Sequence, residues 1–176
     1  MSYVSIRKFE EKDIANKVKW INDSQNNQYL HYDIPLNVQK TRNWFTKNKN
    51  HSDRYDAIIE YTGIPVGIIG LLGIENGRAE YYITMGEQTY KGKGIAKQAS
   101  ILLLDYAFSV LGLAEVYLYT EVDNIGAQKL FQKCGFTQKR REIKSAMNRG
   151  RLVDRFYYCV TPQNILSEKT GGKDDE

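Results

Sequence analysis

A glycine-rich corner, Tyr90–Ala96, separates two regular segments of this chain. Gly92 and Gly94 lack a Cβ atom, so the backbone adopts positive φ angles there at little cost and consecutive amides point at one spot. The apolar periodicity that follows predicts a helix from Ile95 to about Leu111, whose positive dipole end adds to those amides. The corner therefore predicts an anion site, and a phosphate-bearing cofactor is the first inference. An ordinary strand-to-helix turn is the alternative.

Two familiar glycine-rich phosphate sites do not fit this corner. A Walker A loop ends in Gly-Lys followed by Ser or Thr, and the chain has no such ending there. A dinucleotide-binding fingerprint stands near the first strand and has an acidic ribose ligand further along, whereas this corner follows four predicted strands. Its place in the order of elements therefore favours another kind of phosphate site.

The elements that must position the corner alternate between strand-like and helix-like periodicity. Strands are predicted at Val4–Phe9, Tyr55–Tyr61, Pro65–Ile74, Ala79–Met85, Glu115–Thr120, Thr137–Ile143 and Leu152–Val160, and helices at Glu11–Asp23, after an Asn37 cap, after the corner, and after an Asp123 or Asn124 cap. An Asn76-Gly77 turn makes the second to fourth strands an antiparallel meander. Residues 24–36 lack periodicity, and we expect them to form a substrate-facing lid.

Length and composition are those of an ordinary globular protein. The 176 residues are 41% hydrophobic and 26% charged, which predicts one domain over residues 1–164 and a disordered tail at 165–176. The two cysteines have no CxxC spacing and the histidines do not cluster, so neither a disulfide framework nor a metal site is expected. No apolar run resembles a signal peptide or a membrane span, and the expected location is the cytoplasm.

Much of the formal net charge of +4 lies between residues 139 and 155. A solvated hairpin surface explains these charges, and attraction of a phosphate or nucleotide is the alternative. The basic residues do not form a recognised nucleic-acid-binding motif, so nucleic acid is not an expected partner.

Two motifs carry a resemblance to a known family. The first is Lys91-Gly92-Lys93-Gly94-Ile95-Ala96, and the second is the Asn-led segment Asn124–Phe136. In this order and spacing they resemble the pyrophosphate loop, (Gln/Arg)-x-x-Gly-x-(Gly/Ala), and the Asn-x-x-Ala-x-x-Leu-(Tyr/Phe)-x-Lys-x-Gly-Phe helix of the GNAT acetyltransferase superfamily. The resemblance covers about Val4 to Val160. It departs at Lys91, which offers a point charge in place of the usual Gln or Arg.

The resemblance implies an α+β fold whose mixed, mainly antiparallel sheet contains a splayed strand pair and carries flanking helices. It also implies an N-acetyltransferase that uses acetyl-CoA, with the pantetheine arm between the splayed strands and the diphosphate on the amides of the corner. The implied cofactor-binding residues are Ile83, Met85, Lys91, Gly92, Lys93, Gly94, Ile95, Ala96, Asn124, Ala127, Phe131 and Lys133. A homodimer is a further expectation from the family.

Glu80 is the candidate general base. An attacking amine must be neutral, and its solution pKa is near ~10, so a nearby base or desolvation has to favour proton loss. In the alternating strand Ala79–Met85, Glu80 shares a face with Tyr82 and precedes the expected splay. A solvated or ion-paired carboxylate is the alternative.

The usual general acid of the family is missing from this chain. Many relatives have a tyrosine in the Asn-led helix that protonates the departing thiolate, but that position is Phe131, which has no proton to donate. We expect Phe131 to be a core residue or a wall beside the pantetheine. Water, the ammonium product, Tyr117 and Tyr119 remain alternative proton sources.

The N-terminal third is similar to a branch that contains ribosomal-protein N-terminal, spermidine and nucleotide-linked amino-sugar acetyltransferases. Few acidic residues stand in residues 24–45, which argues against a polyamine, and polar and aromatic side chains there suit a sugar ring. We therefore expect a nucleotide-linked amino sugar as acceptor, with a peptide amine or a polyamine as alternatives. A non-catalytic acyl-CoA sensor is the other class that stays open. The candidate acceptor-binding residues are Trp20, Asn22, Tyr29, Tyr82 and Tyr119.

Overall fold

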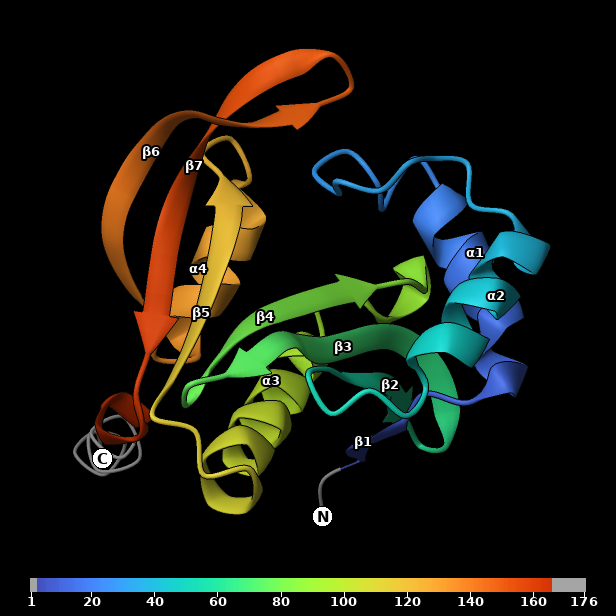
Figure 1. Ribbon diagram of the computed structural model, residues 1–176, viewed down its shortest axis with the longest axis horizontal. Coiled ribbons are helices and arrows are strands. Elements are labelled where there is room, and N and C mark those ends of the chain that lie inside the picture. Colours follow the sequence, from blue (N-terminus) through green and yellow to red (C-terminus); the bar gives the residue numbers. More distant parts are fainter. Residues whose placement is uncertain (1–2, 166–176) are drawn as a thin grey trace.

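A computed structural model of the protein describes residues 3–165. The predicted tail at 165–176 therefore lies, apart from its first residue, outside the described residues. Helices and strands follow the predicted order (Figure 1): β1 Val4–Lys8, η1 Glu11–Asp13, α1 Ile14–Asn22, α2 Val38–Asn48, β2 Tyr55–Tyr61, β3 Ile64–Glu75, β4 Arg78–Met85, η2 Gln88–Tyr90, α3 Ile95–Asp105, η3 Tyr106–Val110, β5 Glu115–Glu121, α4 Ile125–Lys133, β6 Thr137–Asn148 and β7 Arg151–Val160.

These strands form one sheet in the order β1-β2-β3-β4-β5-β7-β6. Each neighbouring pair is antiparallel except β4 and β5, which are parallel because α3 crosses over between them. The predicted α+β fold with a mixed, mainly antiparallel sheet is confirmed.

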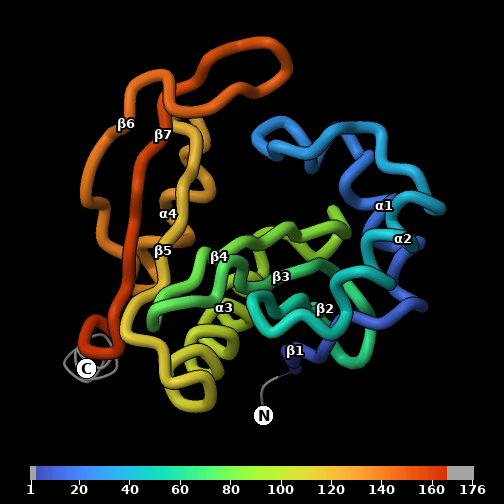
Figure 2. The backbone as a smooth tube through the Cα atoms, viewed as in Figure 1, coloured from blue at the N-terminus to red at the C-terminus, as the bar shows by residue number. Residues whose placement is uncertain are grey.

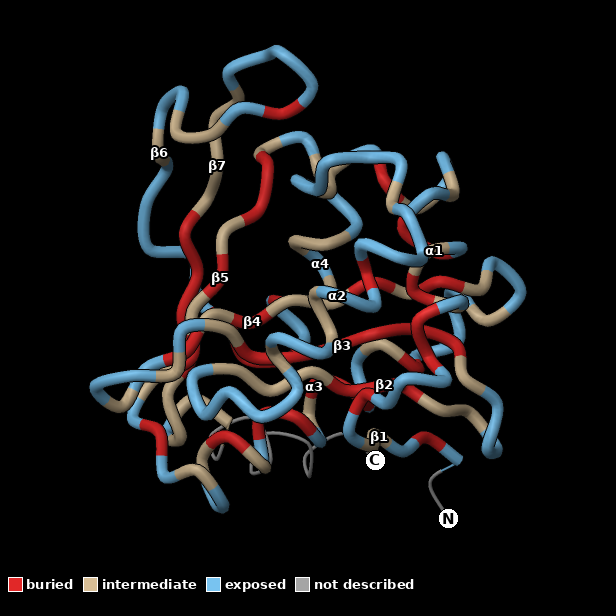
Figure 3. Tube along the Cα trace, turned by 45° about the vertical axis from the view of Figure 1, so that its right-hand side comes forward, coloured by how far each residue is buried: buried red, intermediate tan, exposed pale blue. Residues whose placement is uncertain are grey.

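Helices cover both faces of the β1–β4 half of the sheet, with α1 and α2 on one face and α3 on the other (Figure 1). Successive side chains of a strand point to opposite faces, and β2 shows this directly. Ile58 packs in the core beneath α1 together with Trp20. Its neighbours Ala57 and Ile59 belong to the larger core beneath α3. This layering buries the centre of the sheet, where β3 is buried from Val66 to Leu71 (Figure 3).

The parallel pairing of β4 with β5 is short. It joins Arg78 to Glu115 and ends where Glu80 lies opposite Tyr117, whereas β5 continues beside β7 as far as Glu121. Beyond Glu80, β4 therefore has β3 on one side and no strand on the other. The two strands diverge from that point, as Figure 2 shows. The predicted splay lies directly after Glu80.

Several local signals of the sequence are confirmed. The Asn37 side chain accepts the Lys40 amide at 3.1 Å, and the Asn124 side chain accepts the Ala127 amide at 3.3 Å, so both residues cap their helices. Asn76 and Gly77 have φ angles of 51° and 73°, which fits a tight hairpin turn between β3 and β4.

Two segments differ from their predicted extent. The helix after the corner is α-helical only to Asp105, and its last turn is π-helical over Tyr106–Val110. Strand β6 runs to Asn148, five residues beyond the predicted end, because it bends through register shifts while staying paired with β7. The tip of the β6–β7 hairpin thereby extends beyond the end of the neighbouring strand β5 (Figure 1).

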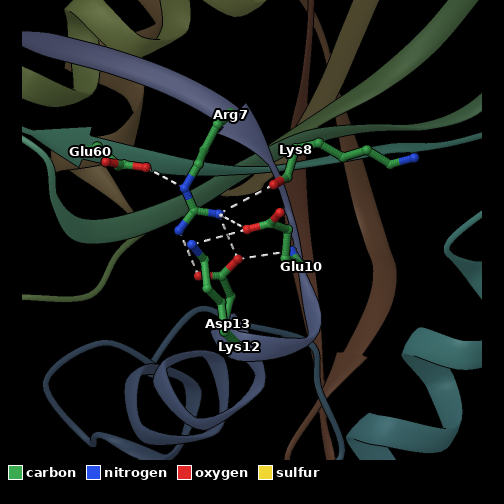
Figure 4. Close-up of polar contacts among 6 residues, drawn as sticks. All are labelled: Arg7, Lys8, Glu10, Lys12, Asp13 and Glu60. Atoms are coloured by element: carbon green, nitrogen blue, oxygen red, sulfur yellow. Dashed lines mark hydrogen bonds and ion pairs between the residues drawn. The ribbon is translucent and has the colours of Figure 1, made fainter.

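An ion-paired cluster around Arg7 fixes the start of α1 to the sheet (Figure 4). The Arg7 guanidinium on β1 bonds both carboxylate oxygens of Asp13 at 2.8 Å and also pairs with Glu60 of β2. Asp13 in turn accepts the Glu10 amide, which orders the turn before α1. Within residues 3–165, no helix is long and apolar enough to cross a bilayer.

Candidate active site

A cavity of about 510 Å³ lies where β4 and β5 separate. Its walls come from β3, β4, β5, β7, α1, α2, α4, Arg54 before β2 and the segment 24–36, so the predicted lid faces it. Eight of the predicted site residues line it, namely Tyr29, Glu80, Tyr82, Ile83, Tyr119, Asn124, Ala127 and Phe131. The structure thus brings together side chains that are up to 102 positions apart in the chain, from Tyr29 to Phe131.

Glu80 supplies a half-buried carboxylate to this cavity. It makes no hydrogen bond or ion pair with any other residue that the structure describes. Burial raises the pKa of Glu80, and the nearby positive charge of Arg155 opposes part of that rise. A carboxylate with a raised pKa and unoccupied lone pairs suits a general base.

The strand alternation around Glu80 follows the prediction. Tyr81 is buried in the core, where its hydroxyl and that of Ser100 are 2.6 Å apart. Tyr82 lies on the Glu80 face, but its hydroxyl donates to Asp56. Tyr82 therefore offers its ring to the cavity, because its proton is already engaged.

Phe131 is both a core residue and part of the cavity wall. Only 6% of it is exposed, and its ring lies 5.7 Å from that of Tyr81 and 5.9 Å from that of Phe136, centroid to centroid. Tyr119 lines the same cavity, with the Arg155 guanidinium 4.3 Å from its ring centroid. Of the two tyrosines considered as proton sources, Tyr119 is the one that lines the cavity.

The glycine corner has the predicted geometry. Gly92 and Gly94 have φ angles of 77° and 76°, and a Cβ at either would stand in open space. The amides of Gly94, Ile95 and Ala96 donate no hydrogen bond to any described residue, because they begin α3. Ile95 as a whole is 2% exposed and its side chain packs in the core, so it offers no side chain to a ligand.

The lysines near the corner differ in their surroundings. The Lys91 ammonium donates to Asn26 Oδ1 at 2.6 Å, and Asn26 bonds the carbonyls of Trp20 and Gly86 at 3.0 Å. Lys91 therefore links the corner to segment 24–36, and a contact with a phosphate requires it to leave Asn26. Lys93 and Lys133 are exposed, on the loop before α3 and at the end of α4.

Two predicted acceptor-binding residues do not reach the cavity. Trp20 is 1% exposed, packs against Gly86 and donates its indole N–H to Glu87 at 2.9 Å. Asn22 is exposed and bonds both backbone groups of Leu36. Both residues support the lid without lining the cavity. Trp20 supports the first part of segment 24–36, and Asn22 is bonded to its last residue, Leu36. Met85 also lies outside the cavity lining, at the end of β4 opposite Gly67.

The family model named Acetyltransferase (GNAT) domain matches residues 4–137. The chain belongs to the GNAT acetyltransferase family. It is an acetyl-CoA-dependent N-acetyltransferase.

Relatives agree with this assignment. Spermidine N(1)-acetyltransferase from Escherichia coli (strain K12) is 28% identical over 163 residues, which cover 83% of this chain and 87% of that protein. A crystal structure of spermidine N-acetyltransferase from Vibrio cholerae in complex with CoA and spermine has a TM-score of 0.86 at 22% identity, over 93% of this chain and 98% of that one. A dodecameric structure of the Vibrio protein has a TM-score of 0.81 at 21% identity, over 94% and 98%.

In this GNAT chain the lid is fastened to the tip of the β6–β7 hairpin (Figure 2). Arg149 donates to the Asn27 carbonyl at 2.8 Å and to its side-chain oxygen at 2.6 Å. Asn148 donates to the Gln28 carbonyl at 3.1 Å and to Glu121 at 2.6 Å. These bonds hold the lid over the cavity from the side opposite α1.

Replacing Arg149 by Ala should raise the KM for the acceptor roughly three- to tenfold, because hydrogen bonds from a charged donor that close the lid are lost. The Kd for CoA should change less than this KM, because Lys91 joins the corner to Asn26 through a bond that does not involve Arg149. Steady-state kinetics and calorimetry measure the two quantities. Arg141→Ala is the matched control, because Arg141 pairs with Asp154 within the same hairpin. An equal rise in the KM for the acceptor in both variants would contradict the proposal that the Arg149–Asn27 bonds hold the lid closed.

Several cavity residues escaped sequence reasoning, including Lys17, His31, Arg54, Glu121 and Arg155. They come from separate elements, so no local motif joins them. One signal was present for Lys17, which stands three residues after Ile14 and four before Ile21, on the apolar face of α1. A lysine among buried positions is unusual, so Lys17 could have been identified from the sequence as a candidate site residue.

Proposed function

We propose that this chain transfers the acetyl group of acetyl-CoA to the primary amine of a small aliphatic acceptor, with Glu80 as general base. The observation that supports it best is the placement of an unpartnered, half-buried carboxylate at the point where β4 and β5 separate. A nitrogen–carbon bond forms as the carbon–sulfur bond of the thioester breaks. Glu80 takes the proton that the nitrogen loses, directly or through a water. The departing thiolate gains a proton from water, or takes the second proton that the nitrogen loses as the tetrahedral intermediate collapses to the amide.

The chain offers suitable groups for acetyl-CoA. The unpaired amides of Gly94, Ile95 and Ala96 are donors for the diphosphate, and Gly92 leaves room for it. The edge of β4 that faces β5 offers backbone groups at Ile83 and Met85 to the amides of pantetheine. Asn124, Ala127 and Phe131 would flank it from α4, and Lys93 and Lys133 offer charge to the phosphates.

The acceptor class that we propose is an alkyl amine, the class to which polyamines belong. The names of the Escherichia coli relative and the Vibrio complex support that class and give no support to the nucleotide-linked amino sugar expected from residues 24–45. The sequence argument against a polyamine counted acidic residues in that segment alone. The cavity also receives Glu80 from β4 and Glu121 from β5, which supply carboxylates from elsewhere in the chain.

Thiol release from acetyl-CoA, followed continuously with a panel of amines, tests the proposal. The panel contains spermidine, spermine, an amino sugar, a peptide with an unblocked α-amine and simple alkyl diamines. We expect turnover with at least one alkyl amine. CoA binding in calorimetry without turnover across the panel would favour the acyl-CoA sensor instead. Absence of CoA binding by the folded chain would remove both interpretations.

Self-association and location remain proposals. The dodecameric Vibrio structure supports an oligomer in general and does not distinguish the expected homodimer. We keep the cytoplasm as the proposed location. Among residues 3–165 no three His, Cys, Asp or Glu side chains gather as a metal site would require, and the predicted independence from metal stays a prediction.

A further inference from the structure

Lys17 on α1 is a buried cation without a paired anion. Only 7% of the residue is exposed, and its ammonium makes no hydrogen bond or ion pair with any residue in the range 3–165. It lies 3.4 Å from the Trp44 ring centroid and 5.8 Å from that of Tyr32. Burial lowers the pKa of Lys17 to about 8. Aromatic faces compensate a cation only in part, because a cation–π contact is weaker than the hydration that it replaces.

The surroundings of Lys17 place this charge where a ligand would meet it. Lys17, Tyr32 and Trp44 line the acceptor cavity and also line an adjoining cavity of about 440 Å³ under residues 32–41. The Lys17 side chain thus stands at the junction of the two spaces. Arg54 lines the same part of the acceptor cavity, with its Nε and Nη2 atoms on the Asp56 carboxylate at 2.7 and 2.9 Å.

The charges of the two joined cavities are distributed unevenly. Glu80 and Glu121 lie on the strands that form the splay, and Arg155 of β7 places one positive charge near Glu80. Lys17 and Arg54 stand in the wall formed by α1 and the start of β2, and Lys40 lines the adjoining space, where Asp33 is the carboxylate. Asp56 forms its ion pair with Arg54, and its charge acts on Lys17 only at a distance, so the Lys17 ammonium keeps unoccupied donor positions among the described residues.

We propose that Lys17, assisted by Arg54, forms an anion subsite of the acceptor cavity, so that the acceptor is an alkyl primary amine with a carboxylate or phosphate at its other end. This inference rests on the proposed acetyl transfer and narrows its acceptor. An anion on Lys17 forms a charge-assisted hydrogen bond in a desolvated place. A polyamine would instead bring a second ammonium towards Lys17, and like charges disfavour that ligand.

Three series of acceptors of matched chain length test this subsite. They are ω-amino carboxylates, α,ω-diamines and aminoalkyl phosphates, with spermidine as the reference. We expect kcat/KM for an anionic acceptor to exceed that of the diamine of equal length by about tenfold or more, as one charge-assisted bond allows. Comparison of the first and third series identifies the anion. Calorimetry of the same compounds with the CoA-loaded chain gives a readout that is independent of turnover.

Variants of Lys17 decide whether this residue sets the preference. Lys17→Met should lower the ratio of kcat/KM for the anionic acceptor to kcat/KM for the diamine by roughly ten- to a hundredfold, mainly through a higher KM for the anionic acceptor. Lys17→Arg should restore the ratio, because the charge is restored. Lys19→Met is the matched control on the same helix, since Lys19 is exposed and pairs with Glu87 at 3.1 Å. Thermal unfolding of each variant shows whether it is folded.

Each outcome bears on one of the two proposals. A diamine or spermidine preferred over the anionic acceptors by the native chain, or a ratio that Lys17→Met leaves unchanged, would overturn the subsite while acetyl transfer stands. Failure to turn over any amine would overturn the proposed function. In that case the calorimetric preference and its dependence on Lys17 would still decide whether the anion subsite exists.

Discussion

Glu80→Gln is expected to lower kcat/KM at neutral pH about a hundred- to a thousandfold, since a positioned general base contributes roughly that factor. Gln keeps the shape of the side chain but cannot take the proton of the attacking amine. Glu80 makes no bond within the described structure, so its replacement should leave the fold intact. Thiol release with the best acceptor of the panel measures the effect.

The pH profile of the same variant tests the assignment more sharply. Burial raises the pKa of Glu80, so the basic form is lost as the pH falls through that raised value. The native chain should therefore lose kcat/KM on the acidic side at a pH above the ordinary pKa of a glutamate, and Glu80→Gln should lack this limb. Glu75→Gln, on an exposed residue at the end of β3, is the control that should keep it. A variant profile that matches the native one in rate and shape would exclude Glu80 as the base.

Glu121 is the other carboxylate in the cavity, and its bonds explain why we do not assign it as the base. Its Oε2 lies 2.9 Å from His31 Nε2 and accepts from Asn148 Nδ2 at 2.6 Å. Both partners belong to the structure that closes the cavity, namely the lid and the hairpin tip. Glu121 therefore holds the lid in place through Oε2, whereas neither oxygen of Glu80 is bonded to another residue in the range 3–165.

The parts of the site that follow from local rules were predictable from the sequence. Positive φ at Gly92 and Gly94 follows from the absence of a Cβ, and the cap at Asn124 follows from its side-chain oxygen. Alternation along β4 placed Glu80 and Tyr82 on one face. Each of these inferences needs only neighbouring residues, because the physical cause lies within one turn or one strand.

The parts that depend on tertiary contacts were not predictable in this way. Trp20 has a side chain of the kind that stacks on a sugar ring. It packs into the core instead, because Gly86 after the end of β4 leaves room for its indole. The contact of Arg149 with Asn27 joins positions 122 residues apart. No pattern in either segment specifies the other, since their meeting depends on how far the bent β6–β7 hairpin extends.

Gly94→Asp is expected to raise the Kd for CoA about a hundredfold or more, because a carboxylate beside the diphosphate costs several kcal/mol through like-charge repulsion. Gly94 has a φ angle of 76°, in the left-handed region that Asp and Asn tolerate better than other residues with a side chain. A Cβ there would meet no atom within 4 Å, so the new side chain stands in the space that we assign to the ligand. Calorimetry with CoA measures the loss.

Gly94→Asn separates the effect of the added charge on CoA affinity from the effect of the added side chain. Asn has almost the same size and the same backbone strain, so this variant should lose far less affinity than Gly94→Asp. The gap between the two should narrow as salt is added, because exposed charges are screened over about 10 Å at 0.1 M ionic strength. Equal affinities for CoA in the two variants at low salt would mean that the diphosphate does not lie at this corner. The anion site inferred from Gly92 and Gly94 would then have to belong to another ligand.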